Sequence, residues 1–295
     1  MSKPRLATLV LGGCTGCHLA LLDTHEALLD ILEAADLVHS PLTEGDEIPE
    51  CDIMLVEGAV ANEHDEEIVK RAREQAKVLV AMGACATLGG IGGLRNLQTV
   101  GEVFETAYGD EAGPGDESLP RLFRRVRPIS ALVPVDVEVP GCAPNTETLV
   151  EVIGAALNGQ LWKAPRRNLC HECGRRHETM LDHSSAFVAD AVYSVMELEN
   201  IDPDRCFLEQ GVVCMGPMTR EGCTARCTAA NVPCRGCMGP SRPEFEQGGK
   251  MVDALAAVLP AGAIMYLDDL IGTGYRFSTA VSVLPGLWGE GGEEQ

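Results

Sequence analysis

Short apolar runs alternate with longer amphipathic stretches along the first half of this chain. Four runs of five residues have the mainly apolar character of buried strands: 7–11, 53–57, 78–82 and 135–139. The stretches between them repeat apolar residues at helical spacing and predict helices over 18–35, 64–75, 97–108 and 146–157. Strands that alternate with helices form βαβ units, so the pattern predicts an α/β domain built on a parallel sheet.

The pattern changes after Trp162. Eight cysteines fall between Cys170 and Cys237 with little periodic structure, and the tail that follows is apolar and partly helical. We therefore expect two domains. Residues 1–161 form the α/β domain, and residues 162–295 form a smaller, loop-rich domain.

The charge of the chain narrows the choice of partners. The 295 residues include 23 Lys and Arg against 44 Asp and Glu, a formal net charge of -21, which disfavours nucleic acids and anionic membranes. No run of 18 apolar residues occurs, so no membrane insertion is expected, and the run at 7–11 is too short for a signal peptide. A basic segment, RLFRRVR at 121–127, predicts either a solvated surface or an interface.

We therefore expect a cytoplasmic protein, in which cysteines are reduced thiols or metal ligands rather than disulfides. The cysteine count of thirteen agrees with this, because it is odd.

Four cysteines follow the ends of predicted strands. Cys14 and Cys17 come after the first strand, Cys85 after the third and Cys142 after the fourth. Parallel strands end at one edge of the sheet, so we expect these thiols to meet there. Cys51 precedes the second strand, which places it at the opposite edge as an inert buried thiol.

Four convergent thiols suit either zinc or a [4Fe-4S] cluster. Structural zinc usually takes two close cysteine pairs, whereas a cluster tolerates dispersed ligands, so the spacing favours a cluster. The predicted helix that begins near His18 would also favour an anionic group at its N-terminus. Four thiols would crowd the phosphate loop of a flavodoxin-like FMN-binding protein.

The other eight cysteines divide into two further groups of four. Two zinc knuckles would explain them, and so would two more clusters. A cluster site in the first domain favours the second interpretation, because several redox centres in one chain can move electrons through the protein. These cysteines are Cys170, Cys173, Cys206, Cys214, Cys223, Cys227, Cys234 and Cys237.

Several motifs together resemble one known family. They are LGGCTGCHLALLD, VEGAV, GACATLGG, VPGCAP and a later series, CMGP, GC and PCRGC. The chain resembles the small, electron-transfer subunit of [NiFe] hydrogenases over about residues 5 to 280. Within that family it is most similar to the cytosolic, deazaflavin-nonreducing (methyl-viologen-reducing) type that is associated with heterodisulfide reductase.

The resemblance implies a flavodoxin-like first domain and three iron-sulfur clusters. Many members of the family hold a [3Fe-4S] medial cluster with three cysteines, but Cys227 would supply a fourth ligand here, so we expect three [4Fe-4S] clusters. The proximal cluster would be held by the first domain, and the distal and medial clusters by the second. Cys227 is added to the medial set because it lies four residues after Cys223, and Cys170 is preferred to its neighbour His171 because it completes a C-x-x-C pair. The implied ligands are Cys14, Cys17, Cys85 and Cys142 (proximal); Cys170, Cys173, Cys206 and Cys214 (distal); and Cys223, Cys227, Cys234 and Cys237 (medial).

The resemblance also implies partners. The nickel-iron centre would belong to a large subunit, so no catalytic residue is expected in this chain. This chain would pass its electrons to a ferredoxin-like acceptor subunit and to heterodisulfide reductase subunits. Deazaflavin and NAD(P) are the alternative acceptors. A non-redox zinc scaffold is the alternative from another class. The cluster subunit of respiratory complex I has an adjacent cysteine pair, which this chain lacks.

Two further residues are candidates for a place beside the proximal cluster. Glu57 ends the second strand, where it would contact the cluster site, relay protons or face the large subunit. His18 directly follows Cys17, where it would form a hydrogen bond near the cluster or only begin the helix.

Overall fold

The chain folds into two compact units. The computed structural model describes residues 2–41, 47–109, 119–177, 191–193, 195–197, 200–242, 246–258, 265 and 267–287. The first unit comprises Met1–Ala164 and Phe277–Gln295, and the second comprises Pro165–Arg276.

The second unit ends at Arg276, whereas the sequence predicts one domain over residues 162–295. The tail from Phe277 groups with the first unit, where Ala280 lies against two glycines, Gly89 and Gly93. A Cβ atom at Gly93 would lie 3.0 Å from that of Ala280, and Arg125 donates a hydrogen bond to the carbonyl of Pro285 at 2.8 Å. The hydrophobic pattern of the tail gives no sign of this return.

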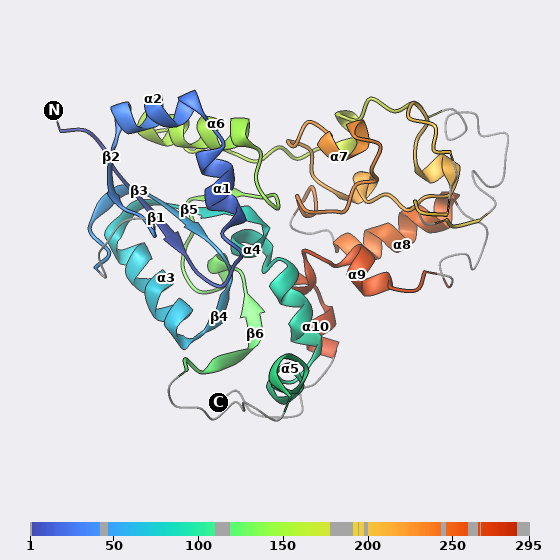
Figure 1. Ribbon diagram of the computed structural model, residues 1–295, viewed down its shortest axis with the longest axis horizontal. Helices are drawn as coiled ribbons and strands as arrows, with labels where there is room; N and C mark the ends of the chain where they lie inside the picture. Colours follow the sequence, from blue (N-terminus) through green and yellow to red (C-terminus); the bar gives the residue numbers. More distant parts are fainter. Residues whose placement is uncertain are drawn as a thin grey trace. The chain divides into compact units, whose positions relative to one another are not determined.

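A five-stranded parallel sheet forms the centre of the first unit (Figure 1). The strand order is β2-β1-β3-β5-β7, in which the chain runs first to one side of β1 and then to the other. This is the doubly wound order of flavodoxin-like folds, so the predicted fold class is confirmed. The strands are β1 (Arg5–Val10), β2 (Asp36–His39), β3 (Cys51–Glu57), β5 (Ala76–Met82) and β7 (Val137–Val139).

Helices cover both faces of the sheet (Figure 1). Val69 and Ala72 of α3 pack into the core on one face, and Leu21, Ile31 and Ile153 from three helices pack into the core on the other. The helices of this unit are α1 (Gly16–Leu22), α2 (Glu26–Ala34), α3 (Glu63–Gln75), α4 (Gly83–Leu88), α5 (Val100–Tyr108), α6 (Thr146–Leu157) and α10 (Leu284–Leu287), with 3₁₀ turns η1 (Ile91–Leu97), η2 (Ile129–Ala131) and η7 (Thr279–Val281).

The helix expected over 18–35 is interrupted. The hydroxyl of Thr24 donates to the carbonyl of Leu21 at 2.8 Å, and His25 adopts a positive φ of 53°. A side chain that bonds the preceding backbone competes with the helix, so α1 ends at Leu22 and α2 begins at Glu26. The helix expected over 97–108 begins only after Thr99, which forms a capping box with Glu102.

The basic segment at 121–127 forms a strand that the hydrophobic pattern did not predict. Strand β6 (Leu122–Arg127) pairs antiparallel with β4 (Val60–Asn62). Two arginines of the basic segment lie near acids of α3: Arg121 lies 2.7 Å from Glu63, and Arg127 lies 3.5 Å from Glu66. Part of the basic charge is therefore matched within the chain.

The second unit has no sheet among its described residues and is built from short turns and helices, as the sequence indicates. Its core contains Phe207, Met251 and Leu255. The guanidinium of Arg175 lies 3.8 Å from the centre of the Phe207 ring. The elements are η3 (Leu169–His171), η4 (Leu208–Gln210), η5 (Gly216–Met218), α7 (Arg226–Ala229), α8 (Gln247–Val258) and α9 (Leu270–Gly274).

Candidate iron-sulfur sites

The register of the sheet brings four strand ends into one row. Val10 pairs with Glu57, Glu57 with Met82, and Met82 with Val139. The loops that follow β1, β5 and β7 therefore leave the sheet at one edge. They carry Cys14 and Cys17, then Cys85, then Cys142, as the sequence predicted.

The four thiols of this first set are close enough to interact electrostatically. Burial, and then the neighbouring Cys142 and Cys14, raise the pKa of Cys85 to about 11. Burial, then Glu57 and Cys85, also raise the pKa of Cys17 above its usual range. Since each thiolate disfavours the next, a cation between them would release their protons as it binds.

Glycines hold the backbone against these sulfur atoms. Gly83 has φ 93°, and an added Cβ atom would overlap the sulfur of Cys17. Gly90 has φ 59°, and a Cβ there would lie 2.5 Å from the sulfur of Cys85. Because four thiols and a side-chain-free backbone are the donors and the cradle that a [4Fe-4S] cluster requires, the set fits that group.

Glu57 and His18 contact one another next to Cys17. The backbone N–H of His18 donates to Oε2 of Glu57 at 2.9 Å, and Nδ1 of His18 lies 3.2 Å from the same oxygen. Burial, the largest single influence, acts to raise the pKa of Glu57, but the His18 side chain, the His18 backbone N–H and the Cys17 thiol together lower it, so the pKa lies below its ordinary value. Both residues that the sequence predicts near the cysteines therefore lie next to Cys17 or its loop, and they contact each other.

The second set of thiols shares one pocket. Cys170, Cys173, Cys206 and Cys214 line it together with Phe207. Burial, followed by the other three thiols, raises the pKa of Cys170 to about 12. A Cβ atom at Gly216 would lie 3.3 Å from the sulfur of Cys170 and 3.6 Å from that of Cys214, so a glycine again gives the backbone close access. This set fits a cluster by the same criteria as the first.

Two histidines near this pocket have different surroundings. His171 is exposed and lines a separate pocket, whereas its neighbour Cys170 lines the pocket of the thiols. His177 also lines the thiol pocket, and its Nδ1 atom is buried without a hydrogen-bond partner in the described part of the chain. His177 was not singled out from the sequence, because it lies outside the C-x-x-C motif, four residues after Cys173.

The third set is arranged as two pairs. Burial raises the pKa of Cys223, with smaller contributions from Glu172 and Cys227. The pKa of Cys234 is raised by burial, then by Cys214 of the second set, and less by Cys237. The third set therefore lies next to the second, and Cys227 is its exposed member.

The segment between Cys223 and Cys227 has an uncommon backbone. Thr224 and Ala225 adopt the left-handed conformation, with φ 55° and 51°. Such residues cost of order 1 kcal/mol each and persist only where their surroundings impose the conformation. The two consecutive residues turn the chain sharply between the two cysteines.

Two features are absent from the residues that the structure describes. No three His, Cys, Asp or Glu side chains among them are grouped to hold a single metal ion. The fit of the first and second thiol sets to a cluster rests on their donor atoms and glycine backbone, and that of the third set on its donor atoms alone. No described helix has the length and apolar character needed to span a membrane.

The chain is similar to known redox proteins. The model of the family described as NADH ubiquinone oxidoreductase, 20 Kd subunit, matches residues 14–156. A subunit of the F420-non-reducing hydrogenase of Methanothermobacter marburgensis is 38% identical, with 96% of each chain covered. The iron-sulfur subunit of the F420-non-reducing hydrogenase of Archaeoglobus profundus is 32% identical, over 86% of this chain and 88% of that protein.

A solved structure resembles part of the chain. It is a chain of an NAD⁺-reducing [NiFe]-hydrogenase in the H₂-reduced state, with 36% identity and a TM-score of 0.51. The match covers 55% of this chain and 96% of the other. The long relatives, in contrast, also cover the cysteine-rich second unit.

Proposed function

Because the chain belongs to the family of F420-non-reducing [NiFe] hydrogenase small subunits, we propose that it carries electrons between a nickel-iron large subunit and an acceptor protein. Membership confirms the resemblance on which the sequence analysis relied and makes the chain a subunit of an oxidoreductase. The finer proposal is that three [4Fe-4S] clusters, held by twelve cysteines, provide the route through the protein.

Each thiol set is assigned to one cluster. The first set would hold the proximal cluster, the second the distal cluster and the third the medial cluster. A [4Fe-4S] cluster supplies reversible one-electron carriage when it is bound. The chain supplies thiolates, close backbone N–H groups and, at the first set, the Glu57 carboxylate that holds the N–H of His18. The sets are Cys14, Cys17, Cys85 and Cys142; Cys170, Cys173, Cys206 and Cys214; and Cys223, Cys227, Cys234 and Cys237.

The observation that carries the proposal is the convergence of four thiols from three separate strand ends. Cys14 and Cys142 are exposed, whereas Cys17 and Cys85 are half-buried beneath them. The set thus lies at the surface of the sheet edge. This position suits electron exchange with another protein that covers it.

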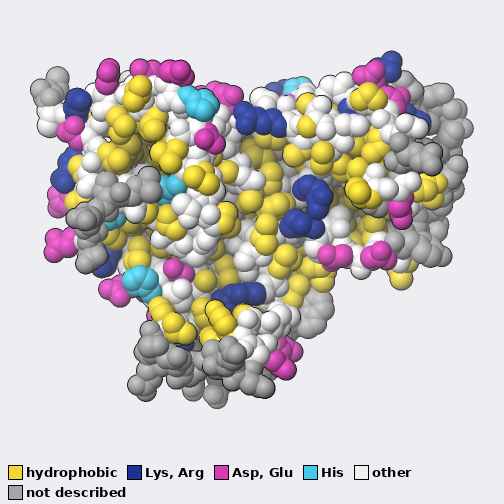
Figure 2. All heavy atoms as spheres, in the orientation of Figure 1, with side chains coloured by type: hydrophobic (Ala, Val, Ile, Leu, Met, Phe, Trp, Pro, Cys, Tyr) yellow, Lys and Arg dark blue, Asp and Glu magenta, His cyan; other side chains and the backbone are white. Residues whose placement is uncertain are grey.

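An apolar surface next to the first set supports a large-subunit partner. Leu19 and Leu22 of α1 are 58% and 43% exposed, and Leu29 of α2 is 63% exposed. Hydrophobic side chains gather over these helices in Figure 2. Leucines this exposed are unfavourable in water, so we expect the large subunit to cover this surface together with Cys14.

The acceptor is proposed to be a ferredoxin-like subunit associated with a heterodisulfide reductase. The long relatives carry the name F420-non-reducing, which disfavours deazaflavin as acceptor. The similar chain of an NAD⁺-reducing enzyme covers only 55% of this chain, which disfavours NAD(P). The long relatives that also cover the second unit are F420-non-reducing enzymes, so the second unit supports an acceptor of that type. We also propose that the protein is cytoplasmic.

Electron transfer by the assembled protein tests the proposal. The chain is produced anaerobically with a hydrogenase large subunit, and hydrogen-dependent reduction of methyl viologen is measured. Cys14→Ser should lower the rate of methyl viologen reduction by more than about a hundredfold, because the first electron carrier is lost. Cys51→Ser is the matched control and should keep at least about half of the activity. Full activity in Cys14→Ser would overturn the proposal.

A further inference from the structure

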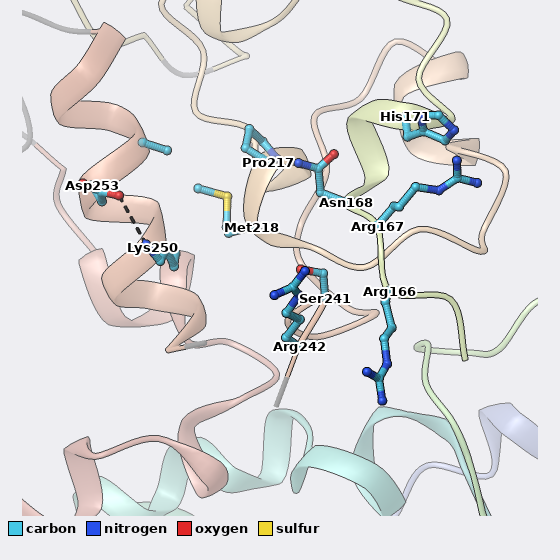
Figure 3. Close-up of a pocket in the computed structure, with 11 residues that line it drawn as sticks. Arg166, Arg167, Asn168, His171, Pro217, Met218, Ser241, Arg242, Lys250 and Asp253 are labelled. Atoms are coloured by element: carbon cyan, nitrogen blue, oxygen red, sulfur yellow. Dashed lines mark ion pairs between the residues drawn. The ribbon is translucent and has the colours of Figure 1, made fainter. Parts of the chain in front are cut away.

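A larger pocket lies in the second unit beside the second thiol set. It has a volume of about 630 Å³ and is bounded by α8, η5 and the segment that includes Arg166 and His171 (Figure 3). Figure 3 shows Lys250 and Asp253 of α8 on one side and the arginine-bearing segment on the other. None of the cysteines lines this pocket.

The pocket is basic although the chain is acidic. Arg166, Arg167, Arg242 and Lys250 line it, with Asp253 as the acidic lining residue. Asp253 lies 3.5 Å from Lys250. The net charge of the chain is -21, so a concave surface with this excess of positive charge stands out against its surroundings. Clefts lined by one sign of charge concentrate the field and attract the opposite charge.

One arginine of the pocket is oriented by a hydrogen bond to a buried glutamate. Nε of Arg167 donates to Oε1 of Glu221 at 3.0 Å, and the side chain of Glu221 is 6% exposed. Arg167 itself is 66% exposed, so its guanidinium is oriented by a buried acid and remains open to solvent. A buried acid in this position fixes a cation for recognition, because it restricts the rotamers of the long side chain.

The pocket and the second thiol set share a wall. Pro217 of η5 lines both the basic pocket and the thiol pocket. The preceding residue, Gly216, lies against the sulfurs of Cys170 and Cys214. His171, which lines the basic pocket, directly follows Cys170. A molecule held in the basic pocket is therefore separated from these thiols by a single turn of chain.

We propose that the basic pocket is the docking site for an acidic segment, rich in Asp and Glu, of the protein that exchanges electrons with the second thiol set. The inference rests on the proposed electron-transfer function and adds the surface and the charge by which the acceptor is recognised. Guanidinium and ammonium groups pair with carboxylates, and the negative remainder of the chain repels nucleic acids. Attraction between the two surfaces also speeds their encounter and orients the partner toward the thiols.

A labelled hexaglutamate peptide is the probe for this site. Its binding to the cluster-loaded full-length chain, produced with a large subunit, is followed by fluorescence anisotropy at about 50 mM and about 300 mM salt. The test variant carries Arg166→Glu and Lys250→Glu. The control carries Lys70→Glu and Arg71→Glu on the exposed face of α3, which change the net charge by the same amount. Iron content and hydrogen-dependent reduction of methyl viologen are measured on every sample.

We expect saturable binding to the wild type that weakens about tenfold in the test variant and also at the higher salt concentration. The control should bind within about twofold of the wild type, and Arg166→Gln should give an intermediate loss. All variants should keep their iron and their reduction of methyl viologen, since that acceptor is a small cation that does not require the site.

Three results would overturn the docking proposal. They are absence of saturable binding by the wild type, equal loss in the control variant, and displacement of the peptide by pyrophosphate at an equal concentration, which would identify a site for small phosphates. Failure of the electron-transfer function would be seen separately, as missing iron or missing reduction of methyl viologen in the wild type.

Discussion

Glu57 accepts the backbone N–H of His18 at 2.9 Å and lies 3.2 Å from Nδ1 of the same residue. The two residues are 39 positions apart in sequence and are only 1% and 4% exposed. Glu57 is the last residue of β3, and His18 follows Cys17 in the first turn of α1. One buried carboxylate therefore ties the cysteine loop to the central strand of the sheet.

Removal of this carboxylate should loosen the cysteine loop. Glu57→Ala leaves the N–H of His18 buried without its acceptor, which should lower the free energy of unfolding by about 2–3 kcal/mol. Glu57→Gln keeps an acceptor and should cost about 1 kcal/mol. Hydrogen exchange of residues 16–22 should be faster in the Ala variant than in the Gln variant.

The exposed His64 provides the control for this prediction. His64→Ala, at the start of α3, should leave both the stability and the exchange of residues 16–22 unchanged. Equal exchange rates in Glu57→Ala and the wild type would show that the contact does not hold the loop.

Cys51 should be inert at neutral pH. It is 4% exposed in the core of the sheet, and burial together with Asp52 raises its pKa from 9.0 to about 11. The folded protein holds this proton more tightly than the unfolded chain does. The thiol is therefore without effect on the pH dependence of stability below about pH 9, and it destabilises the fold increasingly as the pH rises from 9.0 to about 11.

Cys51→Ala should reduce this alkaline loss of stability by at most about 1.4 kcal/mol per pH unit in that interval. Denaturant unfolding of the two proteins between about pH 8 and about pH 11 measures the difference. Parallel curves for the variant and the wild type would mean that Cys51 does not titrate as its burial requires. Iron content should be equal in the two proteins, and loss of iron on changing Cys51 would contradict its placement at the far edge of the sheet.

Arg175 should be essential for the second thiol set. It is 6% exposed, lines the thiol pocket and donates to the carbonyls of Asp202 and Arg205 at 2.9 Å. Arg175→Ala removes these bonds and the contact with Phe207, and should cost about 3–5 kcal/mol. The neighbouring Arg176 is exposed, and Arg176→Ala should cost less than about 1 kcal/mol.

Thermal unfolding and iron content distinguish the two arginine variants. We expect Arg175→Ala to lose iron at a lower temperature than the wild type, and Arg176→Ala to match the wild type. Similar unfolding of the two variants would refute the role assigned to Arg175.

Cys227 should determine the type of the third cluster. It is exposed and follows the left-handed turn of Thr224 and Ala225. If Cys227 is a ligand, the oxidised wild type should lack a strong [3Fe-4S] signal in electron paramagnetic resonance, and Cys227→Ala should produce one. A strong signal in the intact wild type would exclude Cys227 as a ligand.

The sequence predicts the sheet edge but not the contacts behind it. The first thiol set is predictable because parallel strands end at one edge, and this rule needs no side-chain geometry. The bond between Glu57 and His18 depends on the register of β1 against β3, which a hydrophobic pattern does not specify. The sequence therefore identifies Glu57 and His18 as separate candidates, but it does not predict that they contact each other.

Other elements were missed for physical reasons that differ. Strand β6 is rich in arginine, and it pairs with β4, which lies about sixty residues earlier in the sequence. The return of the tail to the first unit depends on glycines at 89 and 93 that leave room for Ala280. The three arginines and the lysine of the basic pocket are dispersed over 166–250, so only the folded chain brings them together.

The most direct test of the account is the count of metal and sulfide in the chain. The protein is produced anaerobically with its large subunit, and iron, zinc and acid-labile sulfide are measured per complex, with ⁵⁷Fe Mössbauer spectra to identify the clusters. Three cubane clusters predict about twelve iron and about twelve sulfide ions in this chain, beyond the metal of the large subunit. Zinc at the thiol sites without acid-labile sulfide would contradict the account.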